Sequence, residues 1–217
     1  MPLAGKGMLI TSMDIDPADE PEFNRWYDRE HLAERVAIEG FLEARRYVAH
    51  EAAPKYFCTY STKEFETLTS PAYAQALANQ TERSRTNISR FRNMGRVIGR
   101  ITASRGQGRG AALGVVRLRP PPEGRDALRD ELRARLDPGP LDGIVSMHIV
   151  ESDPALSKSL TEPDAVNPGA GDWYVLIDGT DVARVGEIAE TRFDPPGATV
   201  ISTGIYRLMW DLPKSDL

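Results

Sequence analysis

The sequence predicts an α+β protein built from two tandem ferredoxin-like units, each with the element order β-α-β-β-α-β. Strand-like and helix-like patterns follow that order over residues 7–104, and the same order returns over residues 111–212. A Gly-rich stretch, RGQGRG, separates the two runs. We therefore expect an N-terminal unit at 1–105, a linker at 106–110 and a C-terminal unit at 111–217.

The N-terminal unit begins with an apolar strand bounded by glycine and by the turn-like sequence DPADEP. Asp19 suits the N-cap of the helix that follows, Pro21 suits its first turn, and Gly40 suits its end. A later helical stretch should break at Ser70-Pro71. The expected strands are 7–15, 41–50, 55–62 and 96–104, and the expected helices are 19–38 and 64–91.

The C-terminal unit repeats these elements one for one, which indicates an internal duplication with a period of roughly 100 residues. Its first helix sets Leu128, Leu132 and Leu136 against alternating charges, the pattern of an ordinary core helix. A polar connection at 152–172 has a length typical of a lid, a binding loop or disorder. The expected strands are 112–119, 142–152, 173–180 and 200–212, and the expected helices are 123–136 and 181–193.

Composition restricts the partners and the setting. A net charge of −5 gives no broad reason to expect nucleic acid or an anionic membrane as a partner. A run of arginines from Arg83 to Arg100 is interleaved only with Phe91, so we interpret it as solvated or salt-bridged between the halves. The single cysteine, Cys58, excludes an internal disulfide and a cysteine-based zinc cluster. With no export signal and no run approaching roughly 18 apolar residues, we expect a mature start at the first residue, no membrane span and a cytoplasmic protein.

The most informative stretch is the first helix, which packs polar and aromatic residues into eight positions. On a 100° helical wheel one half carries the apolar residues and should face the protein. An unpaired buried carboxylate is costly, so polar residues on that half indicate something polar beneath it. The eight positions contain Asn24, Trp26, Tyr27, Asp28, Glu30 and His31, and the inward half holds Phe23, Trp26, Tyr27, Glu30, His31, Glu34, Ala37 and Ile38.

The phrase N-x-W-Y-D-x-E-H, followed by G-F-x-x-x-R-R-Y, resembles the first helix and second strand of the dimeric α/β-barrel superfamily, in particular its EthD-like and related uncharacterised members. The resemblance implies that the sheets of the two units pair into a barrel, here within one chain. It also implies a site at Tyr27 and His31, which match an aromatic-x-x-x-His pattern. The superfamily contains cofactor-free monooxygenases, lactone isomerases, polyketide cyclases and decarboxylases, and haem-degrading enzymes. We find no match to a haem ligand and expect neither a cofactor nor a metal.

Each candidate residue has a functional and a structural interpretation. His31 could act as a general acid or base, oriented by Glu30 or Glu34, or could be a hydrogen-bonded core histidine. Tyr27 lies one turn earlier and could polarise a carbonyl, or could be core. Trp26 and Phe23 could sandwich a planar substrate, or could simply be core.

The remaining candidates lie at the edge of the helix and on the strands. Asn24 and Asp28 are expected to make local bonds, for example from Asp28 to Arg45 or Arg46. Arg46 could anchor a substrate carboxylate or could pair with Glu30 or Glu34. The last candidates share one face of the third strand: Tyr56, Cys58 and Tyr60. They could line a pocket or pack against the helices, and we interpret Cys58 as chemically inert.

Two functions follow. In the first, the chain is a cofactor-independent enzyme for a small aromatic or polyketide-like acid, with isomerisation, cyclisation, decarboxylation or oxygenation as its reaction. His31 and Tyr27 would be catalytic, and the pocket would lie between the first helix and the N-terminal sheet. The substrate-binding residues would be Asn24, Trp26, Glu30, Arg46, Tyr56 and Tyr60. In the second, it is a non-catalytic small-molecule-binding or stress-related barrel. In either case the fused barrel could pair with a second copy.

Overall fold

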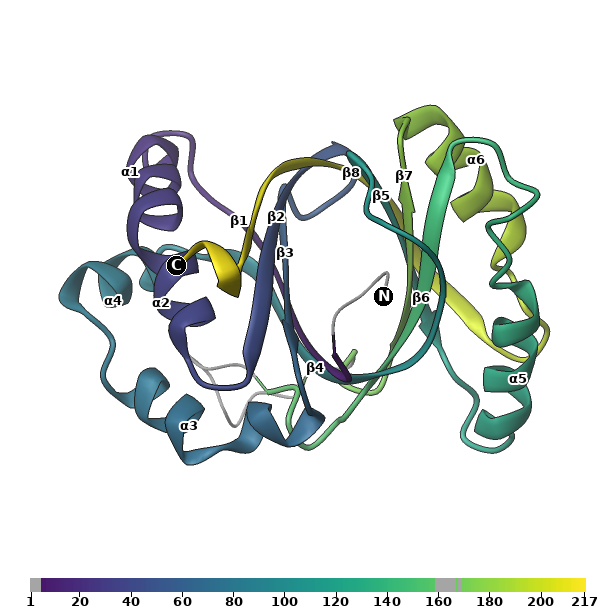
Figure 1. Cartoon of the computed structure of the whole chain (residues 1–217), viewed down its shortest axis with the longest axis horizontal. Helices are drawn as coiled ribbons and strands as arrows, with labels where there is room; N and C mark the ends of the chain where they lie inside the picture. The colour runs from purple at the N-terminus through teal and green to yellow at the C-terminus, as the bar shows by residue number, and fades with distance from the viewer. Residues whose placement is uncertain (1–4, 159–166, 168) are drawn as a thin grey trace.

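The computed structural model describes residues 5–158, 167 and 169–217. Eight antiparallel strands form a closed barrel with helices on two opposite sides (Figure 1). The predicted fold class is confirmed. The strands are β1 Gly7–Asp14, β2 Phe41–Glu51, β3 Tyr56–Thr62, β4 Arg92–Gly106, β5 Ala112–Arg119, β6 Ile144–Ser152, β7 Trp173–Gly179 and β8 Thr199–Pro213.

The strand order around the barrel is β1-β3-β2-β8-β5-β7-β6-β4. Each half thus contributes four neighbouring strands, β4-β1-β3-β2 from the N-terminal half and β8-β5-β7-β6 from the C-terminal half, in the same relative order. The halves join where β2 pairs with β8 and where β4 pairs with β6. Because the barrel is closed, the edge strands of each four-stranded sheet pair with those of the other sheet and are not exposed as free edges.

The helices cover the outward faces of the two sheets. The C-terminal half has two regular helices close to their expected positions, whereas the helical segments of the N-terminal half are short and interrupted. The helical segments are α1 Glu20–Trp26, η1 Tyr27–His31, α2 Leu32–Ala37, η2 Phe65–Thr69, α3 Pro71–Ala78, α4 Glu82–Ser89, α5 Arg125–Arg135, α6 Val182–Arg192 and η3 Lys214–Asp216.

The predicted helix at 64–91 divides into three pieces. The expected break at Ser70-Pro71 is confirmed, because the Ser70 hydroxyl accepts from the backbone N–H of Tyr73 and caps α3. After this break we expected a single helix to Phe91, which was wrong, because the chain breaks again before Glu82. Thr81 marks this second break: its hydroxyl accepts from Ser84 N–H as the N-cap of α4.

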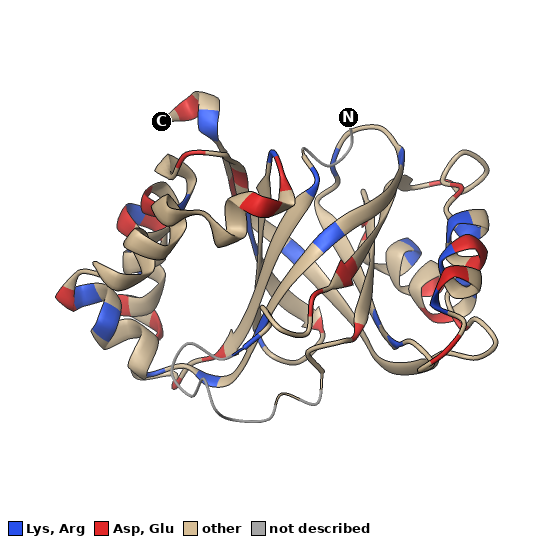
Figure 2. Ribbon diagram, turned by 90° about the horizontal axis from the view of Figure 1, so that it is seen from below, with Lys and Arg blue, Asp and Glu red and all other residues tan. Residues whose placement is uncertain are grey.

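Three apolar cores follow from this arrangement. One lies between the N-terminal helices and their sheet, one fills the barrel, and one lies between α5, α6 and the C-terminal sheet. Figure 2 shows charged residues gathered on the helices that flank the barrel, with a few on the strands. None of the helices in the described part of the chain is both long enough and apolar enough to cross a membrane.

A buried ionic network closes one end of the barrel and pins the linker there. Arg45 donates to Asp178 at 3.0 Å, which joins β2 of one half to β7 of the other. Arg109 of the linker pairs with Glu43, and Gly110 N–H donates to Asp178 at 3.3 Å. The linker is therefore bonded into the junction between the two halves.

Candidate functional site

The first helix contains a π-turn at the predicted site. The backbone N–H of Leu32 bonds to the carbonyl of Tyr27, and η1 separates two α-helical segments. Phe23 and Trp26 before the π-turn and Tyr27 at its start are buried, and after it Leu32, Arg35 and Val36 are buried. The inward positions shift by one residue because a π-turn holds one extra residue.

This shift corrects the helical-wheel prediction. Ala37 was expected to face inward but is exposed, and Arg35, which the wheel placed outside the inward half, is buried with 5% of its surface accessible. A regular wheel cannot anticipate the change, because it assumes 3.6 residues per turn throughout. π-turns occur frequently at functional sites, so the interruption itself draws attention to Tyr27–His31.

A cavity of about 50 Å³ lies between these helices and the outward face of the N-terminal sheet. The strands β1, β3 and β4 form its floor, and η1, α2, α3 and α4 form its walls. Its apolar lining includes Leu9, Met13, Leu77, Ile88, Phe91 and Met94, and its polar lining includes Thr11, Tyr27, His31, Arg35, Tyr60 and Arg96. The position agrees with the predicted pocket, and the cavity touches both Tyr27 and His31.

The polar lining carries buried atoms that lack hydrogen-bond partners in the described part of the chain. They are Thr11 Oγ1, His31 Nδ1, Arg35 Nε and Nη1, Tyr60 OH and Arg96 Nε. A buried polar atom left unpaired costs about 1–3 kcal/mol, and most such atoms in native proteins have a partner. The Tyr60 hydroxyl neighbours the Tyr27 phenol and the Thr11 hydroxyl neighbours the Cys58 thiol, so the four nitrogen atoms of His31, Arg35 and Arg96 are the ones that a ligand or water would complete.

The electrostatics of the cavity keep its histidine and its two deeply buried tyrosines neutral. Burial, followed by the charges of Arg35 and Arg46, holds the pKa of His31 well below its usual 6.5. Burial raises the pKa values of Tyr27 and Tyr60 well above their usual 10. At neutral pH the cavity therefore offers a neutral imidazole that can accept a proton and two phenols that can donate hydrogen bonds. The Cys58 thiol behind them has its pKa raised to about 11, again mainly by burial.

Arg46 lies beside this cavity but does not line it. Its guanidinium is 4.5 Å from the Tyr27 ring centroid and 5.2 Å from that of Tyr56. It donates to Asp28 at 2.7 Å and to Asn24. The bond to Asp28 confirms one predicted local contact, whereas the alternative pairing with Glu30 or Glu34 was wrong.

Asn24 and Tyr56 belong to the same arrangement. Asn24 Nδ2 donates to Tyr56 OH at 3.4 Å, and Trp210 Nε1 of β8 donates to Asp28 at 2.9 Å. These contacts fasten the first helix to β2, β3 and the last strand. Arg46 packs against the Tyr27 ring on the side away from the cavity. Asn24, Arg46 and Tyr56 themselves do not line the cavity.

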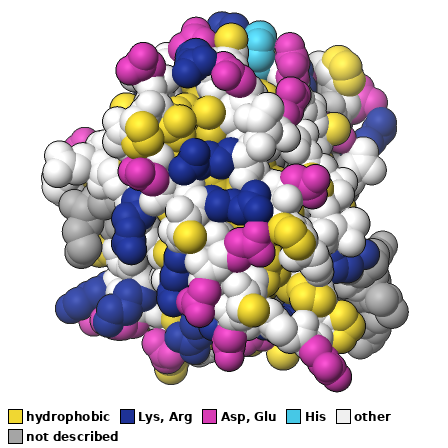
Figure 3. Space-filling view, turned by 90° about the vertical axis from the view of Figure 1, so that its right-hand side faces the viewer, with side chains coloured by type: hydrophobic (Ala, Val, Ile, Leu, Met, Phe, Trp, Pro, Cys, Tyr) yellow, Lys and Arg dark blue, Asp and Glu magenta, His cyan; other side chains and the backbone are white. Residues whose placement is uncertain are grey.

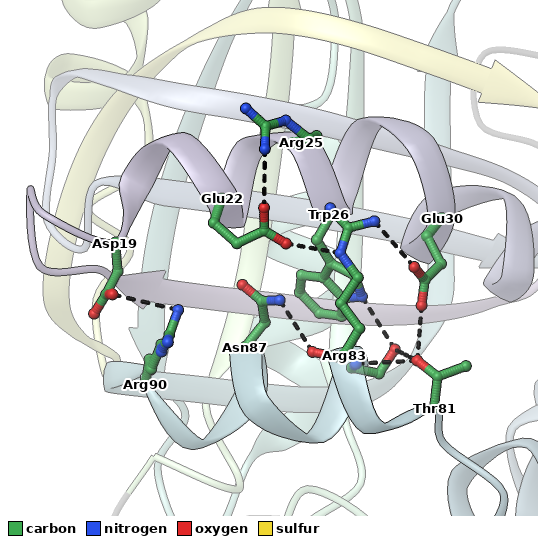
Figure 4. Close-up of polar contacts among 10 residues, drawn as sticks. Asp19, Glu22, Arg25, Trp26, Glu30, Thr81, Arg83, Asn87 and Arg90 are labelled. Atoms are coloured by element: carbon green, nitrogen blue, oxygen red, sulfur yellow. Dashed lines mark hydrogen bonds and ion pairs between the residues drawn. The ribbon is translucent and has the colours of Figure 1, made fainter.

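Trp26 and Glu30 connect the first helix to α4 (Figure 4). Trp26 Nε1 donates to Ser84 Oγ at 3.0 Å, and the Trp26 ring lies 4.2 Å from that of His31. Glu30 accepts from Thr81 at 2.7 Å and from Arg83 at 3.1 Å. Trp26 thus supports the His31 ring, and Glu30 is engaged on the helix surface and makes no hydrogen bond to His31.

Sequence reasoning missed Thr11, Arg35 and Arg96. Arg35 was missed because of the π-turn, for which no local residue pattern gives a reliable signal. Arg96 lay in the arginine run that we interpreted as solvated or salt-bridged; it is buried, and its Nη1 donates to the Leu156 carbonyl at 2.8 Å and the Lys158 carbonyl at 3.2 Å. The interpretation of this run as solvated or salt-bridged was therefore wrong for Arg96, whose bonds to the other half go to backbone carbonyls.

Comparison with known proteins places this geometry in a structural context. No family model matches the chain, and no curated protein sequence matches it. An anthrone oxidase-like protein superposes with a TM-score of 0.64 at 10% identity, covering 98% of this chain and 94% of that one. The chain shares its fold. A candidate monooxygenase of Fusobacterium nucleatum gives 0.58 at 8% identity, over 97% and 95%, and one of Lactobacillus acidophilus gives 0.57 at 10%, over 97% of both chains.

These likenesses show a ferredoxin-like α/β barrel along nearly the whole chain and, at such identities, only the fold. A haem group does not fit the cavity, because 50 Å³ is about one third of the roughly 150 Å³ that holds a benzene molecule. Among the described residues, no three His, Cys, Asp or Glu side chains are grouped so that they could hold a metal ion.

Proposed function

We propose that this chain is a cofactor-independent enzyme that acts on a small aromatic or polyketide-like acid in the cavity of its N-terminal half. The observation that carries the proposal is a single cavity bearing both Tyr27 and His31, lined by buried polar atoms without partners. A perturbed histidine in a concave, mostly apolar site is a strong candidate for proton transfer. The EthD-like aromatic-x-x-x-His pattern supports the same two residues.

The chemistry begins with proton abstraction. The His31 imidazole is neutral at neutral pH, and in the tautomer with its proton on Nε2 the Nδ1 atom accepts a proton from an activated C–H or O–H group of the substrate. The resulting enolate or phenolate receives hydrogen bonds from the phenols of Tyr27 and Tyr60, whose raised pKa values keep them protonated. Isomerisation, cyclisation, decarboxylation and oxygenation can all pass through such an anion.

Among these reactions we favour oxygenation, because the similar structures include an anthrone oxidase-like protein and two candidate monooxygenases. Molecular oxygen is then the oxidant. A substrate CH₂ group becomes C=O, one oxygen atom enters the product and the other leaves in water. The residues of this chain supply the base, the hydrogen bonds to the anion and the exclusion of bulk water.

A non-catalytic binding barrel is the second candidate, and the small volume of the cavity favours it. An aromatic ring needs roughly 150 Å³, so α3 and α4 must shift before a ring can enter a cavity of about 50 Å³. If that shift is not accessible, the cavity holds only a small head group. The activity test below separates the two functions.

The organisation of the chain supports a further part of the proposal. We infer that units 1–105 and 111–217 arose by duplication, since both halves have the same relative strand order. The second unit then takes the place of a partner subunit, and the ligand is a small molecule. The cytoplasmic location and the pairing of two copies stay predictions.

The test is oxygen uptake with an anthrone and with an anthrone that carries a carboxylic acid, comparing His31→Gln with His50→Gln. His50 lies on β2 away from the cavity and serves as the matched control. We expect the wild type and His50→Gln to form the quinone at equal rates and His31→Gln to lose about 10²- to 10⁴-fold in kcat/KM. Equal turnover by His31→Gln would exclude His31 as the base, and tight binding without turnover in any variant would favour the binding barrel.

A further inference from the structure

Arg35 is a buried cation without a counter-ion in the described part of the chain. Only 5% of its surface is accessible, and its Nε and Nη1 atoms have no hydrogen-bond partner there. A buried charge is strongly unfavourable unless an opposite charge or hydrogen bonds compensate for it. By contrast, Arg45 and Arg46, which are also buried, each pair with an aspartate.

Arg96 is a second buried cation at the same cavity. It is 7% accessible, and its bonds go to the carbonyls of Leu156 and Lys158 and, at 3.4 Å, to the hydroxyl of Tyr73. Carbonyl oxygens orient a guanidinium but do not neutralise its charge. Within the described residues no carboxylate lies at ion-pair distance from Arg96.

Among the described residues, the cavity lining contains these two arginines and no aspartate or glutamate. We propose that Arg35 and Arg96 together bind the acidic group of the ligand, a carboxylate or an ionised phenol, and that the C-terminal half positions Arg96. This inference rests on the proposed function, because it assigns the substrate's acidic group to a place in the same site. Guanidinium groups suit this task because they present several donors to one anion.

The part played by the C-terminal half runs through residues 153–158, which follow β6. Asp153 N–H donates to the Ile98 carbonyl at 2.8 Å, and Ile98 N–H donates to Ser157 Oγ at 3.0 Å, so the segment is fastened along β4. Leu156 packs against the N-terminal core, and its carbonyl holds Arg96. The middle of the long predicted connection lies outside the described residues, and its beginning forms this support.

An anion bound by the two arginines would also change the electrostatic environment of His31. The charge of Arg35 lowers the pKa of His31 after burial, the larger cause. An anion bound between the two arginines offsets that charge, so ligand binding should raise the pKa of His31. Arg35 would therefore bind the acid and keep the imidazole unprotonated until the ligand arrives.

The experiment compares benzoate with benzamide, which has nearly the same shape but no charge, by calorimetric titration. Wild type should bind benzoate at least tenfold more tightly, and Arg35→Gln and Arg96→Gln should bind the two compounds equally. Arg35→Lys, which keeps the charge, should retain part of the preference. Arg29→Gln is the matched control, since Arg29 lies on η1 in an exposed position, and it should behave like the wild type.

Two further measurements keep the outcome interpretable if a variant folds poorly. Ser157→Ala removes the two bonds that this hydroxyl makes to the Ile98 backbone and should weaken benzoate binding several-fold without affecting benzamide. Benzoate binding should also raise the pKa of His31 in an NMR titration of the wild type and change it little in Arg35→Gln, a ligand effect that a purely structural arginine does not produce.

The inference is overturned if wild type binds benzoate no better than benzamide, or does not bind it, or if Arg35→Gln keeps the preference for the acid. The proposed function is judged separately, because anthrone is uncharged when it binds. Oxygen uptake that depends on His31, together with no preference for benzoate, would retain the enzyme and reject the arginine pair.

Discussion

The two halves of this barrel have the same strand order but cover their sheets in different ways. In the C-terminal half, α5 and α6 pack Leu128, Leu132, Val185 and Ile188 onto the strands, and charged residues are interspersed over the outer surface of that half (Figure 3). In the N-terminal half, helices interrupted by a π-turn enclose a cavity. Every buried side-chain atom without a partner in the described part of the chain belongs to residues 11–102. The C-terminal half builds the same strand order without counterparts of the unpartnered residues that line this cavity, and under the proposed function these residues serve a ligand.

The largest expected difference in stability is between the two cores that lie between the helices and the sheets, one in each half. Leu132→Ala in α5 removes a fully buried side chain and should lower the free energy of unfolding by about 2–5 kcal/mol. Leu77→Ala in α3 changes a half-buried residue of the cavity wall and should cost about 1 kcal/mol or less. Urea unfolding measures both values.

The same Leu77→Ala variant should bind benzoate more tightly than the wild type, because it enlarges a cavity that is smaller than an aromatic ring requires. Equal losses of stability at the two leucines would mean that the N-terminal helices pack as tightly as α5, contrary to the comparison.

A smaller effect concerns pH. In the unfolded chain a histidine titrates near 6.5, and burial holds the folded-state pKa of His31 well below that value. Between the two pKa values the unfolded state binds a proton that the folded state does not. The free energy of unfolding therefore decreases as the pH falls from 6.5 toward the folded-state pKa, by up to about 1.4 kcal/mol per pH unit for each such histidine.

His148 has its pKa lowered in the same direction by burial inside the barrel, so the wild type should show contributions from both residues. His31→Gln should remove one of them and His50→Gln neither, as measured by urea unfolding at several pH values between 7 and 5. If the stability of His31→Gln depended on pH as steeply as that of the wild type, the pKa of His31 would not be lowered in the folded state.

Periodicity was sufficient for the strands and helices of each half because these patterns are local and occur in both halves, whereas the barrel was expected only from the family resemblance. Asp28 and Arg46 could also be paired in advance, since a helix and the strand that follows it pack together. The candidate site was only partly predictable. His31, Tyr27 and Tyr60 reach the cavity, whereas Asn24, Trp26, Glu30, Arg46 and Tyr56 support the helix around it.

What the sequence could not supply is non-local. Arg35 turns inward because one extra residue is accommodated in the π-turn, a change of about 100° that residue patterns do not record. Arg96 becomes buried because residues 153–158, from the other half of the chain, return to cover β4. Such contacts depend on closure of the barrel, which periodicity alone does not specify.

The central claim is that the ligand binds at His31, and the imidazole resonances of the protein test it most directly. In a benzoate titration followed by NMR, His148 is an internal control, because it lies inside the barrel and bonds to Ser146 and Ser104. We predict that the His31 resonances shift progressively to saturation and that those of His148 stay in place. Saturable binding that leaves His31 unchanged would contradict the account.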